Sequence, residues 1–126
     1  MFLHYNLSFF FFKDILIFEY MNKTRDINGI DALKLASEIS KLPDGYFTIV
    51  FFPYNSTKGL VSKKVRTIER CKTRTQLPDD CFRKDSENFF LFKDEDGRPK
   101  TCYRILIRFI GYSSDNYRLR NVKWTT

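Results

Sequence analysis

The chain has 126 residues, of which 43% are hydrophobic and 17% aromatic, and its formal net charge at pH 7 is +7. This length suits one domain, and the apolar content excludes a chain that is disordered throughout. The basic excess says nothing about the fold, but it favours anionic partners: nucleic acid, anionic lipid or an acidic protein.

The first twenty residues differ in composition from the rest. Fifteen of them are Phe, Leu, Ile, Tyr, Lys or Asn, which A- and T-rich codons specify, and Met21 follows directly. We therefore expect residues 1–20 to be a non-native leader translated from sequence upstream of Met21. A segment that docks on the core and a segment that contacts a membrane are the alternatives.

Stable membrane insertion of this leader is not expected. A transmembrane helix needs about 20 apolar residues, and Lys13 and Asp14 interrupt the apolar run here. The leader also lacks the positive start and the small-residue cleavage site of an export signal. Without its one basic and two acidic residues, residues 21–126 carry a net charge of +8, so the basic character belongs to the predicted domain.

The first predicted element of the domain 21–126 is an amphipathic helix over residues 30–41. Asn28 can accept hydrogen bonds from the first free amides of this helix. Pro43-Asp44-Gly45 ends it. Apolar residues recur at helical spacing at Ala32, Leu35, Ala36, Ile39 and Leu42. We expect this helix to pack against a sheet.

Two strands with a loop between them follow the helix. Aromatic and β-branched residues predict a strand over residues 46–54, with apolar side chains on both faces. Residues 55–62 indicate a loop. The alternating pattern of residues 63–77 is longer than a typical strand, so a bulge or bend is expected there.

The rest of the domain predicts a hairpin and a last strand. Residues 78–87 are a polar excursion. Residues 88–93 and 100–112 alternate on either side of Asp96-Gly97, which is a hairpin signal. Residues 117–124 are typical of a short final strand.

One helix followed by four or five strands predicts an α+β domain. We expect one N-terminal helix followed by a small, strongly bent antiparallel sheet, in other words an SH3-like or OB-like beta barrel. An open sheet with the helix on one face is the alternative.

Basic residues concentrate in residues 58–74, which hold seven Lys and Arg residues and a single acid, Glu69. Side chains alternate along a strand with a period of two. One face would therefore present a row of cations: Lys64, Arg66, Arg70, Lys72 and Arg74. Such a row can contact successive phosphates and release counterions, which gives affinity without sequence readout.

This row predicts a non-enzymatic nucleic-acid-binding domain, with single-stranded DNA as the favoured ligand. Aromatic side chains beside a basic groove are typical of proteins that bind single strands. The predicted stacking residues are Tyr54, Tyr112 and Trp124. The predicted phosphate contacts are Lys63, Lys64, Arg66, Arg70, Lys72, Arg74, Arg104 and Arg108.

Three other interpretations of this surface stay open. A half-exposed sheet often carries basic residues only because they are solvated. The cations could instead bind an acidic protein, for example in a virion or a host complex. A magnesium-dependent nuclease could use Asp85, Glu87 and Asp94, although nothing in their spacing requires it.

An enzyme and a bound cofactor are not expected. No histidine follows His4, so the domain has none for acid–base chemistry. The cysteines are Cys71, Cys81 and Cys102, and no pair has the spacing of a zinc or redox motif. We expect reduced cysteines in a cytoplasmic protein and no metal site. A Cys71–Cys81 bridge is the alternative in an oxidising compartment.

Two stretches carry a resemblance to a known group. They are LPDGYFTIVFFPYN at 42–55 and NFFLFKDEDGRPKTCYRILIRFIGY at 88–112. They resemble small uncharacterised proteins of phages and other mobile elements of Bacteroides-type gut bacteria, including single-stranded DNA microviruses. The resemblance covers about residues 30–124 and carries over no functional residue. It implies a phage or mobile-element accessory protein that handles single-stranded DNA in the bacterial host cytoplasm.

Overall fold

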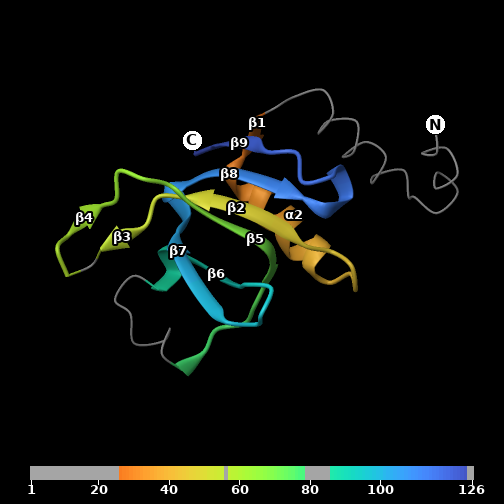
Figure 1. Cartoon of the computed structure of the whole chain (residues 1–126), viewed down its shortest axis with the longest axis horizontal. Helices are drawn as coiled ribbons and strands as arrows, with labels where there is room; N and C mark the ends of the chain where they lie inside the picture. The colour runs from red at the N-terminus through yellow and green to blue at the C-terminus, as the bar shows by residue number, and fades with distance from the viewer. Residues whose placement is uncertain (1–25, 56, 79–85, 125–126) are drawn as a thin grey trace, which may run out of the picture.

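The computed structural model describes residues 26–55, 57–78 and 86–124 (Figure 1). The leader predicted at 1–20 lies outside these residues, as do Cys81 and Asp85. The helix and strands are β1 (Asp26–Asn28), α2 (Gly29–Ser40), β2 (Phe47–Phe51), β3 (Tyr54–Asn55), β4 (Leu60–Val61), β5 (Arg66–Thr73), β6 (Phe89–Lys93), β7 (Pro99–Tyr103), β8 (Ile107–Tyr112) and β9 (Arg120–Lys123). Single 3₁₀ turns lie at Ser86–Asn88, Arg104–Leu106 and Ser113–Asp115.

Most of the strands form one seven-stranded sheet in the order β1-β9-β8-β2-β5-β6-β7. One helix and a sheet confirm the predicted α+β class. The sheet is larger than the predicted small sheet, and it is mixed rather than antiparallel, because β1 runs parallel to β9. Its end strands β1 and β7 do not pair with each other, so the sheet is not closed.

The parallel strand β1 explains this correction. The sequence predicts no element before the helix, but Ile27 is buried there and pairs with Val122 of β9. A strand of three residues with one buried side chain is too short to give an alternating pattern. The structure therefore adds an edge strand directly before the helix.

The helix α2 agrees with its prediction to within one residue at each end. The side-chain oxygen of Asn28 accepts hydrogen bonds from the amides of Ile30 at 2.8 Å and Asp31 at 3.4 Å. These bonds satisfy two of the amides that lack a partner within the helix. No helix among the described residues is long and apolar enough to cross a membrane.

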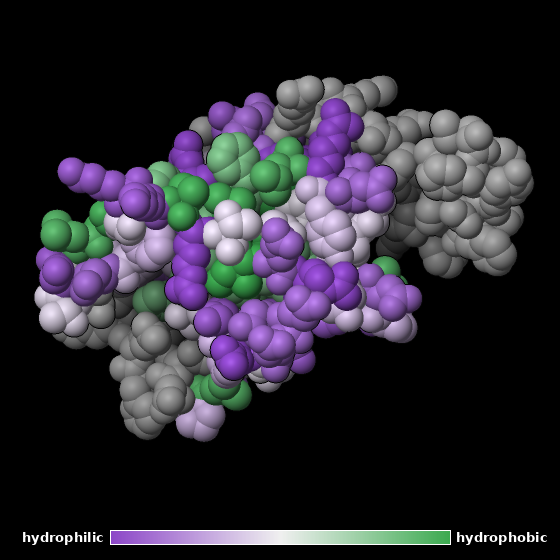
Figure 2. Space-filling model, in the orientation of Figure 1, coloured by the Kyte–Doolittle hydropathy of each residue, from purple (hydrophilic) through white to green (hydrophobic). Residues whose placement is uncertain are grey.

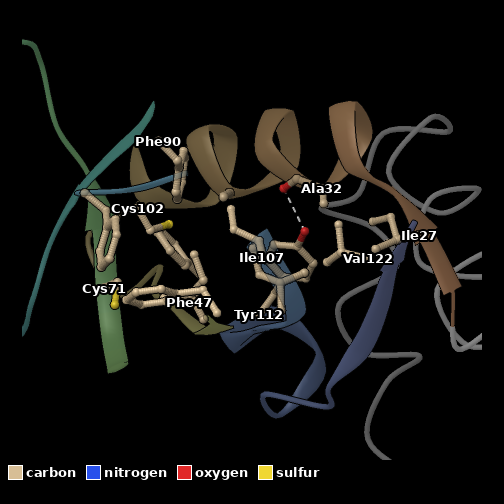
Figure 3. Close-up of a cluster of buried hydrophobic side chains, with 14 of the residues drawn as sticks. Ile27, Ala32, Phe47, Cys71, Phe90, Cys102, Ile107, Tyr112 and Val122 are labelled. Carbon is tan, nitrogen blue, oxygen red and sulfur yellow. Dashed lines mark hydrogen bonds between the residues drawn. The ribbon is translucent and has the colours of Figure 1, made fainter. Parts of the chain in front are cut away.

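Helix and sheet enclose one hydrophobic core. Figure 2 shows apolar side chains gathered over the middle of one face of the molecule, with hydrophilic side chains around them. Figure 3 shows the core itself, in which Ala32 faces the sheet from α2. The ring of Phe47 lies 5.8 Å from that of Phe90 and 6.4 Å from that of Phe92. Aromatic contacts of this kind join β2 to the β6–β7 hairpin.

Strand β5 joins two parts of the seven-stranded sheet. Its first part pairs with β2, and its last residues, Lys72 and Thr73, pair with β6. The register of the pairing with β2 shifts between Ile68 and Cys71, and Arg70 there has a φ of 55°. This irregularity falls inside residues 63–77, where the sequence predicts a bulge or bend.

Two predicted segments divide differently in the structure. Residues 100–112 are not one return strand, because the 3₁₀ turn Arg104–Leu106 separates β7 from β8. The apolar alternation continues through this turn, although Ile105 there is 69% exposed, so the pattern alone does not reveal the break. The predicted loop 55–62 contains a second, two-stranded sheet formed by β3 and β4.

The hydroxyl of Tyr112 gives a test of the contact between helix and sheet. Tyr112 is fully buried, and its hydroxyl donates to the carbonyl oxygen of Ala32 at 2.7 Å (Figure 3). We expect Tyr112→Phe to lower the free energy of unfolding by about 1 kcal/mol, because a buried hydrogen bond is lost with little change in volume. Urea denaturation followed by circular dichroism measures this change. Tyr54→Phe, at an exposed tyrosine, is the control, and an equal loss in both variants would contradict the assignment.

Candidate nucleic-acid interface

The predicted row of cations on β5 is divided by the register shift at Arg70. Arg66 and Ile68 pair with Phe51 and Ile49 of β2, so they lie on the face that Phe51 and Ile49 share. Beyond the shift it is Cys71 that is buried there. Lys72 follows Cys71 and therefore lies on the opposite face from Arg66. The expectation of one cationic face is wrong, because one extra residue reverses the alternation.

Lys72 donates hydrogen bonds to the end of helix α2 and to the turn that follows it. Its ammonium donates to the carbonyl oxygens of Ser40 at 3.1 Å, Leu42 at 2.8 Å and Gly45 at 2.7 Å. It also lies 4.5 Å from the centre of the Tyr46 ring. The last carbonyls of a helix lack partners within the helix, and a cation there is favourable. Lys72 is therefore an internal donor and not a free phosphate contact.

Arg74 is held in a similar way. Its guanidinium donates to the carbonyl oxygens of Phe92 at 2.9 Å, Thr75 at 3.1 Å and Lys100 at 3.1 Å. These three acceptors come from β6, from the residue after Arg74 and from β7. The side chain thus ties the end of β5 to the hairpin, which assigns it a structural role.

Two of the three predicted stacking residues also belong to the packing. The prediction is wrong for Tyr112, because its ring is fully buried and cannot reach a ligand. The indole N–H of Trp124 donates to the carbonyl oxygen of Ile107 at 3.1 Å. The Trp124 ring lies so close to Gly29 that a Cβ there would collide with it. Trp124 is half-buried, and Tyr54, which is 40% exposed, is the most exposed of the three.

Other predicted cations are exposed but do not share one face. Arg70 pairs with Glu95 at 3.1 Å and lies 4.4 Å from the centre of the Tyr46 ring. Arg108 follows the buried Ile107 on β8, so it points away from the core. The remaining predicted cations are Lys63, Lys64, Arg66 and Arg104, all of them exposed. Three of these four lie on the segment between β4 and β5 or at the start of β5.

A pocket beside Arg66 brings Tyr54 together with two aromatic residues that the sequence did not single out. The rings of Tyr54 and Tyr103 meet edge to face, 5.1 Å apart, and Phe89 lies 4.4 Å from Tyr103. The cavity has a volume of about 320 Å³. We call it the aromatic pocket, and its described lining is Phe51, Pro53, Tyr54, Arg66, Ile68, Phe89, Lys100, Thr101, Cys102 and Tyr103.

The charge around the aromatic pocket is positive. Arg66 and Lys100 line it, and none of its described lining residues is acidic. Arg104 lies nearby, because its Nε donates to the carbonyl oxygen of Phe89 at 3.3 Å. Planar rings with cations at their edge can hold a base by stacking and its phosphate by charge.

The hairpin brings two of these rings together, but the turn signal alone does not give their register. Phe89 and Tyr103 are direct partners across β6 and β7. Counting outward from a two-residue turn at Asp96-Gly97 would instead pair Phe89 with Arg104, because the observed loop between Lys93 and Pro99 is longer. The position of Tyr54 beside them depends on the path of the chain between β2 and β5, which no local pattern gives.

The two described acidic residues of the nuclease hypothesis, Glu87 and Asp94, lie in different places. A side-chain oxygen of Asp94 accepts from the amides of Asp96 at 3.0 Å and Arg98 at 2.9 Å, which shapes the hairpin turn. Glu87 lies in a shallow cavity beside the helix. Among the described residues, no group of three or more His, Cys, Asp or Glu side chains could hold a metal ion.

Comparisons with known proteins add no relative. The chain matches no family model, no curated protein and no solved structure. The description of the site therefore depends on the geometry of this chain.

A pair of variants separates structural cations from exposed ones. We expect Lys72→Met to lower the free energy of unfolding by about 1–3 kcal/mol, because three helix-end carbonyls lose a charged donor. Arg66→Met should change it by less than about 0.5 kcal/mol, because Arg66 is exposed. Chemical denaturation of both variants gives the comparison. Equal stability of the two would contradict the role assigned to Lys72.

The two described cysteines should be unreactive in the folded protein. Burial, with a smaller contribution from the Asp94 charge, raises the pKa of the Cys71 thiol from 9.0 to about 12. Burial likewise raises the pKa of Cys102. In a Cys81→Ser protein, which removes the cysteine outside the described residues, a thiol reagent at about pH 8 should label neither until denaturant is added.

The raised pKa of Cys71 predicts that the free energy of unfolding depends on pH. Because the fold favours the neutral Cys71 thiol, the contribution of this thiol to the free energy of unfolding is complete below pH 9.0 and is lost as the pH rises towards about 12. In the labelling experiment on the Cys81→Ser protein, fast reaction in native buffer, at the rate of a small free thiol, would show that Cys71 and Cys102 are not buried.

Proposed function

We propose that this protein is a non-enzymatic nucleic-acid-binding domain that prefers single-stranded DNA. The observation that supports this most is the aromatic pocket, in which Tyr54, Phe89 and Tyr103 meet beside Arg66 and Lys100. Rings and cations in one cavity suit a ligand that alternates planar bases with phosphates. This surface keeps Tyr54 and Arg66 from the predicted set and adds Phe89, Tyr103 and Lys100, which the prediction did not include.

Single strands fit the aromatic pocket better than a duplex. In a duplex the faces of the bases are covered by their neighbours, so an aromatic ring can stack only on a base that has left the helix. The volume of about 320 Å³ is at the small end of ligand pockets. It gives room for one unstacked base. Further exposed cations are Lys63 and Lys64, which precede β5 in the chain, and Arg104, which bonds the carbonyl of Phe89.

The proposed fold type is an SH3-like barrel. Two antiparallel groups support it, β8-β2-β5 and β5-β6-β7, because β5 belongs to both. The 3₁₀ turn between β7 and β8 supports it as well, and the carbonyl oxygen of Leu106 in that turn accepts from the amide of Phe52 at 3.0 Å. Strongly bent sheets of this kind leave loops around an open groove.

In biological terms, we propose an accessory protein of a phage or mobile element that acts in the bacterial cytoplasm. The resemblance of residues 42–55 and 88–112 supports this proposal. The resembling stretches also contribute much of the aromatic pocket, namely Tyr54, Phe89, Lys100 and Tyr103. A compact genome packaged as single-stranded DNA would supply the proposed ligand.

Fluorescence polarisation with labelled single-stranded DNA, duplex DNA and RNA of equal length tests the proposal. We expect single-stranded DNA to bind most tightly. With about four phosphate contacts, the slope of log K against log salt should be about −3. Tyr54→Ala should weaken binding by about 1–3 kcal/mol through lost stacking. Arg66→Met should make the slope shallower by about 0.7.

Lys123→Met is the matched control for loss of one exposed positive charge. Lys123 is exposed on β9, which β8 and β2 separate from β5 in the sheet. It should leave both the affinity and the slope nearly unchanged. Affinity that does not respond to salt, or an equal effect of Lys123→Met and Arg66→Met, would overturn the proposed site.

A further inference from the structure

A second cavity lies on the hairpin that β3 and β4 form, and it shares Pro53 and Tyr54 with the aromatic pocket. We call residues 53–65 the arm, of which all but residue 56 are described. The cavity has a volume of about 690 Å³. Its described lining is Pro53, Tyr54, Asn55, Leu60, Val61, Ser62 and Lys63.

The arm has an internally bonded backbone. Tyr54 and Asn55 pair with Val61 and Leu60. The side chain of Asn55 accepts from the amides of Thr57 at 3.0 Å and Lys58 at 3.1 Å. Gly59 turns the chain with a φ of 65°, and its amide donates to the carbonyl of Asn55 at 2.8 Å. The arm therefore presents its side chains in a fixed arrangement.

Aliphatic side chains on the arm are unusually exposed. Leu60 is 62% exposed, Val61 45% and Val65 48%. Figure 2 shows apolar side chains at the end of the molecule where Figure 1 places β4. Aliphatic side chains exposed together, beside a cavity, are typical of a surface that another molecule covers.

The charge of the arm limits what this molecule can be. Residues 52–68 contain Lys58, Lys63, Lys64 and Arg66 and no acidic residue. An aliphatic surface within a cationic border complements a ligand that is apolar and acidic together. Nucleic acid supplies the charge but no aliphatic groups, and the rings that it stacks on lie in the aromatic pocket.

Backbone geometry favours a peptide as this ligand. The sheet of β3 and β4 stands apart from the seven-stranded sheet, so no strand of the described residues pairs with its outer edges. Such edges can add an extended peptide through main-chain hydrogen bonds. A lipid surface offers no such partners. A short hairpin edge with an open cavity beside it suits one extended segment.

We propose that the arm is a docking site for an extended acidic peptide segment of a partner protein. One or more aliphatic side chains of the peptide fill the cavity lined by Leu60 and Val61. Its carboxylates meet Lys58, Lys63 and Lys64. This proposal does not depend on nucleic-acid binding, because Leu60 and Val61 line only the hairpin cavity. Pro53 and Tyr54 line both cavities, and Lys63 and Lys64 are cations that either ligand could meet.

Selection from a displayed library of random peptides tests the docking site on the full chain. The peptides enriched over bare resin should combine acidic with aliphatic residues. The best of them, synthesised with a fluorescent label, should bind the double variant Leu60→Ser/Val61→Ser about tenfold or more weakly. The matched control Ile105→Ser/Leu119→Ser removes two other exposed aliphatic side chains, 69% and 46% exposed. It should bind like the natural sequence.

Four results would overturn the proposal. They are enrichment of no peptide, enrichment without acidic residues, equal losses in the two double variants, and arm-dependent binding to vesicles of phosphatidylserine and phosphatidylcholine in place of peptide. A dimer that forms without peptide and is lost in Leu60→Ser/Val61→Ser would make a second copy the occupant and overturn it too. Titration with single-stranded DNA separates the two proposals, because the arm variant should bind DNA normally even if no peptide is found.

Discussion

The structure depends on one strand that serves two parts of the sheet. β5 pairs first with β2 and then with β6, and the register of its pairing with β2 shifts between Ile68 and Cys71, just before the pairing with β6 begins. Without the extra residue, the side chains before and after it would keep a single alternation. Cys71 could not then lie in the core on the same face as Ile68. The shift thereby decides which cations of the basic segment reach solvent and which are used internally.

As a consequence, cations that look equivalent in the sequence have different roles in the structure. Lys72, beyond the shift, reaches the carbonyls at the end of α2. Arg74 joins the end of β5 to both strands of the β6–β7 hairpin. Arg66, before the shift, borders the aromatic pocket. A buried carbonyl without a donor is costly, so the fold uses the long basic side chains nearest to those carbonyls.

The sequence predicts the elements whose signals are local. The cap at Asn28 and the hairpin turn at Asp94 come from side chains that bond the backbone two to four residues away. Apolar periodicity likewise places α2 and β6 to within a residue. The irregularity in β5 is also predictable, because the alternating segment is longer than one strand can be. These features need no knowledge of what packs against them.

The remaining features depend on contacts between distant segments. Nothing local shows that Tyr112 bonds Ala32, which is far away in the chain, or that Arg120 is buried to 1% exposure. A tyrosine near a strand end and a basic residue on a strand have the same pattern whether they face solvent or the core. Strand periodicity gives the face of a side chain, but burial and partners decide its use. This is why only some of the residues predicted for the site are accessible in the structure, while others are used inside the fold.

Tyr54 lines both candidate surfaces. The groups around it differ between the two surfaces, and this difference would let one small domain distinguish two kinds of ligand. On one side its ring meets the edge of Tyr103, beside Phe89 and two cations. On the other side the hairpin offers Leu60, Val61 and an unpaired strand edge. Both surfaces are cationic, so charge attracts either kind of anion without distinguishing them. The distinction comes from the neutral groups, because planar rings select bases, whereas aliphatic side chains and a strand edge select a peptide.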